Sequence, residues 1–228
     1  MPVLDTRPEV CVNMAMSVDG RISTRRREHI TLGSRHDRYL MDKLRARADA
    51  VIIGAGTLRH DGFPIRVRDD ALRAKRVAKG LPMHPLNVVL SRSLTLPVTR
   101  DFFSHQETDR LVFTTREAPA ARVRRVSRRA EVIILKGKSL SPRSVLARLY
   151  ARGVRRVVLE GGGEIHWAFE KAGVVDELYI TVTPRLIGGR DAPTILDGTG
   201  FLKKTHRLLD LMSCRRVGNE IFLHYRVR

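Results

Sequence analysis

The chain's most informative stretch runs Val157-Val158-Leu159-Glu160-Gly161-Gly162-Gly163-Glu164-Ile165-His166-Trp167-Ala168-Phe169. An apolar run rich in β-branched residues ends in three glycines, and an amphipathic segment follows. This order predicts a β-strand, a tight turn and the start of a helix. Glycines let the backbone approach a ligand closely, and N–H groups at a helix start favour an anion. The stretch therefore predicts either a phosphate-binding turn, with Glu160 at its mouth to hydrogen-bond a sugar or base edge, or an ordinary turn.

The rest of the chain alternates between apolar runs and helical segments. Strands are predicted at residues 10–16, 50–53, 86–90, 111–113, 132–135, 156–159, 177–183 and 220–227. Helices are predicted at residues 35–47, 141–150 and 164–172, with Tyr39, Leu40 and Leu44 on one face of the first; residues 68–79 predict an exposed helix or loop. This alternation predicts one α/β domain over residues 1–228, with a mostly parallel sheet and antiparallel strands added late.

The composition is that of an ordinary globular protein, with 43% hydrophobic and 29% charged residues. No apolar run approaches the ~18 residues that a membrane-spanning helix needs, and Met1 to Pro8 lacks the apolar core of a signal peptide. The two cysteines, Cys11 and Cys214, lie in strand-like contexts without metal-ligand spacing. We expect buried free thiols in a reducing cytoplasm, and no metal site.

The formal net charge of +19 is the unusual number in the composition. Such a charge indicates nucleic-acid binding, attraction of phosphorylated substrates, or only a solvated basic surface. Aromatic residues make up only 5%, and no zinc-finger, helix-turn-helix or RNA-binding motif is present. Specific nucleic-acid binding is therefore not expected, although a basic nucleic-acid-binding or regulatory protein stays as an alternative of another class.

Four ordered motifs carry a resemblance to a known family: Asn13-Met14-Ala15-Met16-Ser17-Val18-Asp19-Gly20-Arg21, Gly54-Ala55-Gly56-Thr57-Leu58-Arg59-His60-Asp61, Leu159-Glu160-Gly161-Gly162-Gly163, and Val175-Asp176-Glu177-Leu178 with Pro184-Arg185-Leu186-Ile187-Gly188-Gly189. From about residue 9 to residue 227 the chain resembles the riboflavin-biosynthesis reductase domain. The resemblance implies a dihydrofolate-reductase-like fold with a mostly parallel central sheet, flanking helices and antiparallel C-terminal strands. The deaminase half of the bifunctional bacterial members has no counterpart in this sequence.

The resemblance implies an NADPH-dependent oxidoreductase. Its substrate would be a 5′-phosphoribosylamino-pyrimidine, whose ribose is reduced to a ribityl chain by hydride delivery to C1′. The cofactor performs the chemistry, and the protein supplies orientation and charge. No catalytic residue is assigned from the sequence. We also expect a homodimer, because strands 177–183 and 220–227 should form an extended edge region, and such edges are usually covered or paired. The resemblance implies the same.

The resemblance assigns cofactor contacts to residues that follow strands: Thr57, Asp61, Ser91, Arg92, Gly161, Gly162 and Gly163. Arg92 would pair with the 2′-phosphate that distinguishes NADPH from NADH, and the three glycines would cradle the pyrophosphate. Two of these residues keep a structural alternative. Thr57 also fits a helix or turn cap, and Arg92 also fits an ordinary exposed arginine.

The resemblance assigns substrate contacts to Asn13, Arg45, Ile65, Arg68 and Glu160. Arg45 and Arg68 would converge on the 5′-phosphate, because guanidinium–phosphate pairing is strong, although Arg45 also fits a solvated helix face. Asn13 stands where the bifunctional enzymes commonly have lysine. A neutral amide both donates to and accepts from a diaminopyrimidine edge, which favours 2,5-diamino-6-ribosylamino-4(3H)-pyrimidinone 5′-phosphate as the substrate.

Two departures from the family pattern leave the substrate open. The loop after Thr57 has Gly62 in place of a second acid, and His29 stands near a polar serine position of the family. A reductase of a pterin such as dihydrofolate therefore stays as the alternative within enzymes. Asp19 is expected to shape the turn after the first strand, and His166 and Trp167 are expected to pack at a helix start.

Overall fold

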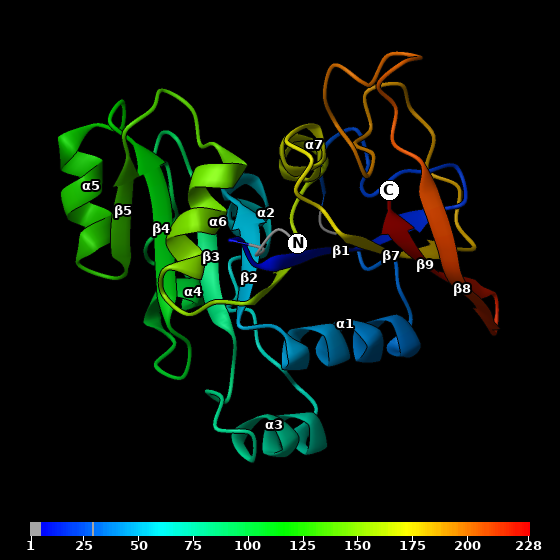
Figure 1. The fold of residues 1–228 in the computed structure, drawn as a ribbon, viewed down its shortest axis with the longest axis horizontal. Helices are drawn as coiled ribbons and strands as arrows, with labels where there is room; N and C mark the ends of the chain where they lie inside the picture. The colour runs from blue at the N-terminus through cyan, green and yellow to red at the C-terminus, as the bar shows by residue number, and fades with distance from the viewer. Residues whose placement is uncertain (1–5, 29) are drawn as a thin grey trace. The chain divides into compact units, whose positions relative to one another are not determined.

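The fold is known from a computed structural model that describes residues 6–28 and 30–228, so His29 lies outside the described residues (Figure 1). The chain divides into two compact units. Of the described residues, 6–9 and Asp42–Val158 form the first unit, and Val10–Met41 and Leu159–Arg228 form the second.

The first unit carries strands in the order β5-β4-β3-β2-β6. Their bounds are β2 (Ala50–Gly54), β3 (Leu86–Leu90), β4 (Arg110–Thr115), β5 (Glu131–Leu135) and β6 (Arg156–Leu159). Pairing from β2 to β5 is parallel throughout, with Ile52 opposite Val88. Every residue of β2 is buried, which matches the continuous apolar run expected of a parallel strand covered on both faces.

Among its described residues, the first unit contains the end of α1 (Arg35–Arg47) from Asp42 onward and five whole helices: α2 (Ala55–Asp61), α3 (Asp70–Val77), α4 (Asp101–Ser104), α5 (Ala120–Ser127) and α6 (Pro142–Tyr150). Their starts follow local rules. Ser141 caps α6 by accepting a hydrogen bond from the Ser144 N–H, ahead of Pro142, and Asp69 caps α3 by accepting from the Leu72 N–H. Figure 1 shows α5 beside β5 and α3 at a distance from the strands.

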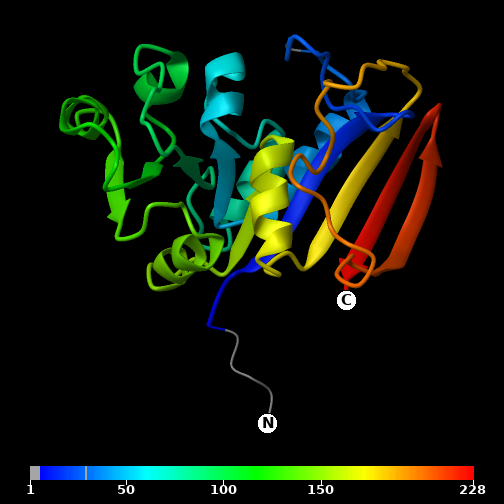
Figure 2. The ribbon, with the colours of Figure 1, turned by 90° about the horizontal axis from the view of Figure 1, so that it is seen from above.

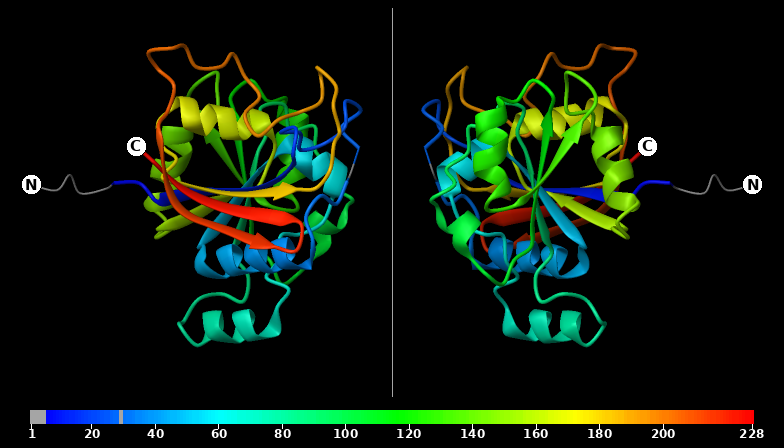
Figure 3. Two further views of the ribbon diagram at one scale, coloured as in Figure 1. Left: turned by 90° about the vertical axis from the view of Figure 1, so that its right-hand side faces the viewer. Right: turned by 90° about the vertical axis from the view of Figure 1, so that its left-hand side faces the viewer.

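The second unit carries strands in the order β1-β7-β9-β8 (Figure 2). Their bounds are β1 (Glu9–Ser17), β7 (Glu177–Thr183), β8 (Leu209–Val217) and β9 (Glu220–Val227). β7 runs parallel to β1, whereas β9 runs antiparallel to both β7 and β8. Figure 3 shows α7 (Gly163–Lys171) on one face of these strands and α1 (Arg35–Arg47) on the other. Glu220 of β9 fixes the start of α1 by accepting from both the backbone N–H and the hydroxyl of Ser34.

The predicted α/β class, with a mostly parallel sheet and antiparallel C-terminal strands, is confirmed, and most elements begin or end within two residues of their predicted bounds. Strand β8 was not predicted, because its Asp210, Ser213 and two arginines break the apolar pattern. The expectation that 177–183 and 220–227 form the edge is therefore wrong, since β9 pairs on both sides and β8 is the terminal strand. The segment 68–79 contains α3.

The burial of α1 and of the two cysteines was not read correctly from the sequence. Tyr39 is 47% exposed, and the buried residues of α1 are Asp42, Leu44 and Arg45, so the helix turns polar side chains inward. Neither cysteine is buried as expected: Cys11 is half-buried, and Cys214 is exposed because both faces of β8 are largely open. Within the described part of the chain, no helix combines the length and the apolar character that crossing a membrane requires.

Candidate functional site

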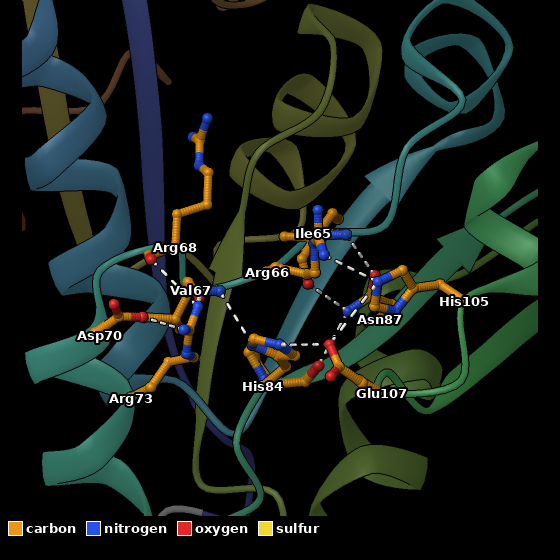
Figure 4. Close-up of polar contacts among 11 residues, drawn as sticks. Ile65, Arg66, Val67, Arg68, Asp70, Arg73, His84, Asn87, His105 and Glu107 are labelled. Atoms are coloured by element: carbon orange, nitrogen blue, oxygen red, sulfur yellow. Dashed lines mark hydrogen bonds and ion pairs between the residues drawn. The ribbon is translucent and has the colours of Figure 1, made fainter.

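The candidate residues fall into one group in each unit. In the first unit, the central feature is the extended segment that follows α2 and leads to α3. Its side chains alternate, with Ile65 and Val67 buried and Arg68 exposed, as in a strand, yet none of the described strands pairs with it. Buried backbone polar groups need partners, and here side chains provide them. The Asn87 amide pairs with both backbone groups of Ile65, and His84 Nδ1 accepts from the Val67 N–H (Figure 4).

Arg45 and Arg68, the two predicted phosphate ligands, lie around one buried carboxylate. Asp42 is 6% exposed, and its Oδ1 is 3.8 Å from Arg45 Nη1 and 3.7 Å from Arg68 Nε. Arg45 also donates to the Arg66 carbonyl at 2.9 Å. Only 10% of the Arg45 side chain is exposed, so the alternative of a solvated helix face is wrong. Half of the Arg68 side chain is exposed, which leaves its guanidinium accessible to an anion.

A fully buried arginine fixes the end of the helix that carries Arg45. Arg76 of α3 is 2% exposed and donates to the carbonyls of Ala46 and Ala48 at the end of α1, and to the Pro82 carbonyl. The guanidinium N–H groups of Arg76 thus satisfy carbonyls that the last turn of a helix leaves without partners. Arg76 thereby joins α3 to α1 through hydrogen bonds.

An imidazole pair supports the other side of the segment. Glu107 Oε2 lies 3.8 Å from His84 Nε2 and 3.8 Å from His105 Nε2, and His105 contacts Arg66 Nη1 at 2.9 Å. Burial lowers the pKa of His84, with Glu107 acting in the opposite direction. A neutral ring has one acceptor nitrogen, which is what the Val67 N–H requires.

The predicted cofactor residues of the first unit lie at the ends of β2 and β3. Thr57 is the third residue of α2, whose N-cap is Gly54, so the alternative that Thr57 is a cap is wrong. Asp61 is the last residue of the same helix. The Ser91 hydroxyl accepts from the Leu94 N–H at 3.0 Å, and Arg92 is exposed beside it.

Sequence reasoning missed two arginines at this turn. Arg122 of α5 donates to the Ser93 carbonyl and the Thr95 hydroxyl, and Arg59 of α2 donates to the Thr95 carbonyl. In the sequence, both arginines counted only toward the formal net charge of +19. The turn after β3 therefore carries more positive charge than Arg92 alone.

Gly62, which replaces the second acid of the family pattern, has a structural role. It ends α2 in the left-handed conformation at φ 68°, and its N–H donates to the Leu58 carbonyl. This is the ordinary helix C-cap use of glycine. The departure therefore has a local explanation that does not involve the substrate.

In the second unit, the predicted glycine turn begins α7. Gly162 is the N-cap at φ 56° and ψ 139°, a conformation that favours glycine. A Cβ on Gly163 would lie 2.4 Å from the Thr194 carbonyl oxygen, so this glycine is required by packing within the protein. The Gly162 carbonyl accepts from Ile165 and His166, which leaves the N–H groups of Gly163 and Glu164 without partners inside the helix.

Asn13 and Glu160 are the predicted substrate residues of this unit. Asn13 lies in β1 and is 7% exposed, and its Oδ1 accepts no hydrogen bond from the described residues. Glu160 follows β6 and is half-buried. Asp37 of α1 was missed, because an acid in the first turn of a helix has an ordinary explanation. Burial raises the pKa of Asp37, the Thr181 hydroxyl lowers it, and the charges of Glu220 and Glu160 raise it further.

Asp19, His166 and Trp167, which were expected to have structural roles, make contacts within the protein. Asp19 accepts from the N–H groups of Ile187 and Gly188, and hydrogen bonds from Ser17 and these two groups lower its pKa to about 2. His166 is fully buried with Nδ1 3.1 Å from the Ile195 carbonyl oxygen, and burial lowers its pKa to about 4. Trp167 packs on Phe201 with ring centroids 4.7 Å apart.

Solved structures define the class of fold. A pyrimidine reductase-like protein from Corynebacterium diphtheriae matches with a TM-score of 0.85 and 24% identity over 97% of this chain and 92% of that one. A deaminase/5-amino-6-(5-phosphoribosylamino)uracil reductase from Thermotoga maritima matches with a TM-score of 0.79 and 21% identity, over 99% of this chain and 58% of that one. The fold is therefore that of the RibD-type, dihydrofolate-reductase-like reductases.

Residues 8–223 match the family described as the RibD C-terminal domain, and the chain belongs to that family. The 2,5-diamino-6-ribosylamino-4(3H)-pyrimidinone 5′-phosphate reductase of Archaeoglobus fulgidus is 38% identical over 87% of this chain and 90% of its own length. The enzyme of the same name from Methanothermobacter thermautotrophicus is 30% identical over 97% of this chain and 99% of its own length. The resemblance inferred from the four motifs is confirmed.

Proposed function

We propose that the chain is a single reductase domain that reduces 2,5-diamino-6-ribosylamino-4(3H)-pyrimidinone 5′-phosphate with NADPH, forming the ribityl chain in the cytoplasm. The names of its full-length relatives support the reaction class. The observation that best supports a phosphorylated substrate is the arrangement of Arg45 and Arg68 around Asp42. Two guanidinium groups on one carboxylate leave one positive charge in excess, which suits a phosphate.

The residues present fit a phosphate-bearing nicotinamide cofactor. The Gly161–Gly163 turn lets the backbone come close to a pyrophosphate, and the N–H groups of Gly163 and Glu164 offer hydrogen bonds to it. Arg92, with Arg122 beside the same turn, would hold the 2′-phosphate, while Thr57, Asp61 and Ser91 would hold neighbouring parts of the cofactor. When bound, NADPH supplies the hydride that reduces C1′.

The chain's own contribution to the substrate is recognition and orientation. Asn13 Oδ1 is a buried acceptor suited to an amino group of the pyrimidine, and Glu160 would accept from a second donor. Ile65 would pack against the substrate from the extended segment. Arg45 and Arg68 would hold the 5′-phosphate, far from C1′, and such remote binding energy orients the reacting carbon.

The assay that tests this proposal follows NADPH oxidation at 340 nm with the diaminopyrimidine phosphate and, separately, with dihydrofolate. We expect turnover of the phosphorylated pyrimidine alone. Turnover of dihydrofolate alone would establish the pterin alternative and refute the proposal. A salt-sensitive affinity for DNA or RNA without reductase activity would instead support a nucleic-acid-binding protein.

We also propose a homodimer. The terminal strand β8 is open on both faces, with Leu209, Leu211 and Met212 each at least 39% exposed. Exposed apolar strands at a sheet edge are usually covered or paired, and a second copy would cover this one. Sedimentation equilibrium at micromolar concentration distinguishes a dimer from the 25.8 kDa chain.

A further inference from the structure

We propose that Asn87 is a positioning residue that sets the register of the segment from Ile65 to Arg68, and thereby presents Arg68 to the phosphate of the substrate. The inference rests on the proposed function for the role of Arg68. Asn87 touches no substrate in this account and acts only through the segment. It is a polar residue in the otherwise apolar strand β3, and its side chain is fully buried.

The Asn87 side-chain amide makes two hydrogen bonds to one residue, Ile65, accepting in one and donating in the other. Its Oδ1 accepts from the Ile65 N–H at 2.7 Å, and its Nδ2 donates to the Ile65 carbonyl at 2.9 Å (Figure 4). The second amide hydrogen goes to the Pro85 carbonyl at 3.0 Å. The orientation of the amide is determined, because an N–H can only donate and a carbonyl can only accept. Asn87 therefore recognises one residue of the segment as a neighbouring strand would.

The consequence for Arg68 follows from the period of an extended chain. Ile65 and Val67 point into the protein, and Arg68 points away from Asn87 and His84 in Figure 4. A slip of one residue would reverse every side chain, burying Arg66 and Arg68 and exposing Val67. His84 contacts only the Val67 N–H, at the longer distance of 3.3 Å, and Arg45 and Arg73 bind only carbonyls of the segment. Asn87 differs from these three side chains because it pairs with both the N–H and the carbonyl of one residue.

Among the described residues, the Asn87 side chain makes no hydrogen bond to another residue of β3. All three of its hydrogen bonds go to Ile65 and Pro85, outside β3, and an apolar side chain of similar size would suit the buried strand as well. An amide at a fully buried position is costly unless it is paired. Its pairing with the segment that presents Arg68 is what gives Asn87 a role beyond packing.

The test compares Asn87→Leu with Val51→Ala. Val51 lies opposite Asn87 in the register of β2 and β3 and is equally buried, so its truncation controls for loss of stability. Amide hydrogen exchange of Ile65 reports the register contact, and steady-state kinetics report its effect. In Asn87→Leu we expect faster exchange at Ile65 and about a tenfold higher KM for the diaminopyrimidine phosphate, with the KM for NADPH within about twofold of wild type. Val51→Ala should change neither KM.

Each remaining outcome overturns a specific statement. Unchanged exchange at Ile65 in Asn87→Leu overturns the register contact, and an unchanged substrate KM overturns positioning of Arg68. An equal rise in both KM values, or the same rise in Val51→Ala, shows a general loss of structure and also overturns the inference. A wild-type protein that is inactive on the phosphorylated pyrimidine overturns the proposed function instead, and the exchange at Ile65 then decides the register contact alone.

Discussion

The segment from Ile65 to Arg68 and the turn from Gly161 to Gly163 are both irregular backbone that carries candidate binding groups, but they are held in opposite ways. In the segment, four side chains bind the backbone: Arg45, Arg73, His84 and Asn87. In the turn, the absence of side chains lets the backbone pack against residues 194–197. Binding sites can thus be fixed by specific polar groups or by close packing, and the two should fail differently when mutated.

The largest effect is expected where packing leaves no room. Gly163→Ala would place a Cβ 2.4 Å from the Thr194 carbonyl oxygen and 2.7 Å from the Asp197 carboxylate, so the backbone must move. We expect the free energy of unfolding to fall by about 3 kcal/mol, measured by urea denaturation. Gly56→Ala is the control, because nothing lies within 4 Å of its added Cβ. It should instead stabilise α2 by roughly 0.5–1 kcal/mol; equal losses in both variants would disprove the packing argument.

The stability of α7, the helix that begins at the glycine turn, should depend on pH. Burial raises the pKa of Glu170 from 4.5 to about 7, and Arg207 and Asp176 act on it in opposite directions. The folded protein therefore binds this proton more tightly than the unfolded chain, so its stability falls as pH rises from 4.5 through 7. Glu170→Gln should raise the free energy of unfolding by roughly 2 kcal/mol at pH 8 and much less at pH 5. A gain independent of pH would contradict the burial of an ionised carboxylate.

The smallest effect is expected at an exposed group. Arg92→Ala removes one of the positive charges at the turn after β3, while Arg122 and Arg59 remain there. We expect the Kd for NADPH to rise about tenfold and the Kd for NADH to stay unchanged, measured through Trp167 fluorescence. Equal losses for both cofactors would show that Arg92 does not recognise the 2′-phosphate.

The sequence predicted the glycine turn better than the segment. Apolar runs show the period of a strand, and capping residues and glycines mark where helices begin. The bounds of β3, β6 and β7 and the start of α6 were therefore predicted to within one residue. The role of Asn87 could not be predicted, because its partner Ile65 is 22 residues away and has no regular structure. A polar residue within the apolar run 86–90 was the available signal. The burial of Asp42 and Arg76 could not be predicted either, because charged residues on helices are normally exposed.

The most direct test is a thermodynamic cycle that combines a change in the protein with a change in the substrate. The kcat/KM is measured for wild type and Arg68→Ala, each with the diaminopyrimidine carrying and lacking its 5′-phosphate. Removing either the phosphate or the guanidinium alone should lower kcat/KM by about 10²-fold, and removing both should cost little more than removing one. NADPH affinity should be the same in both proteins. If the two losses multiply, or if Arg68→Ala is as active as wild type on the phosphorylated substrate, Arg68 does not bind the phosphate and the account is contradicted.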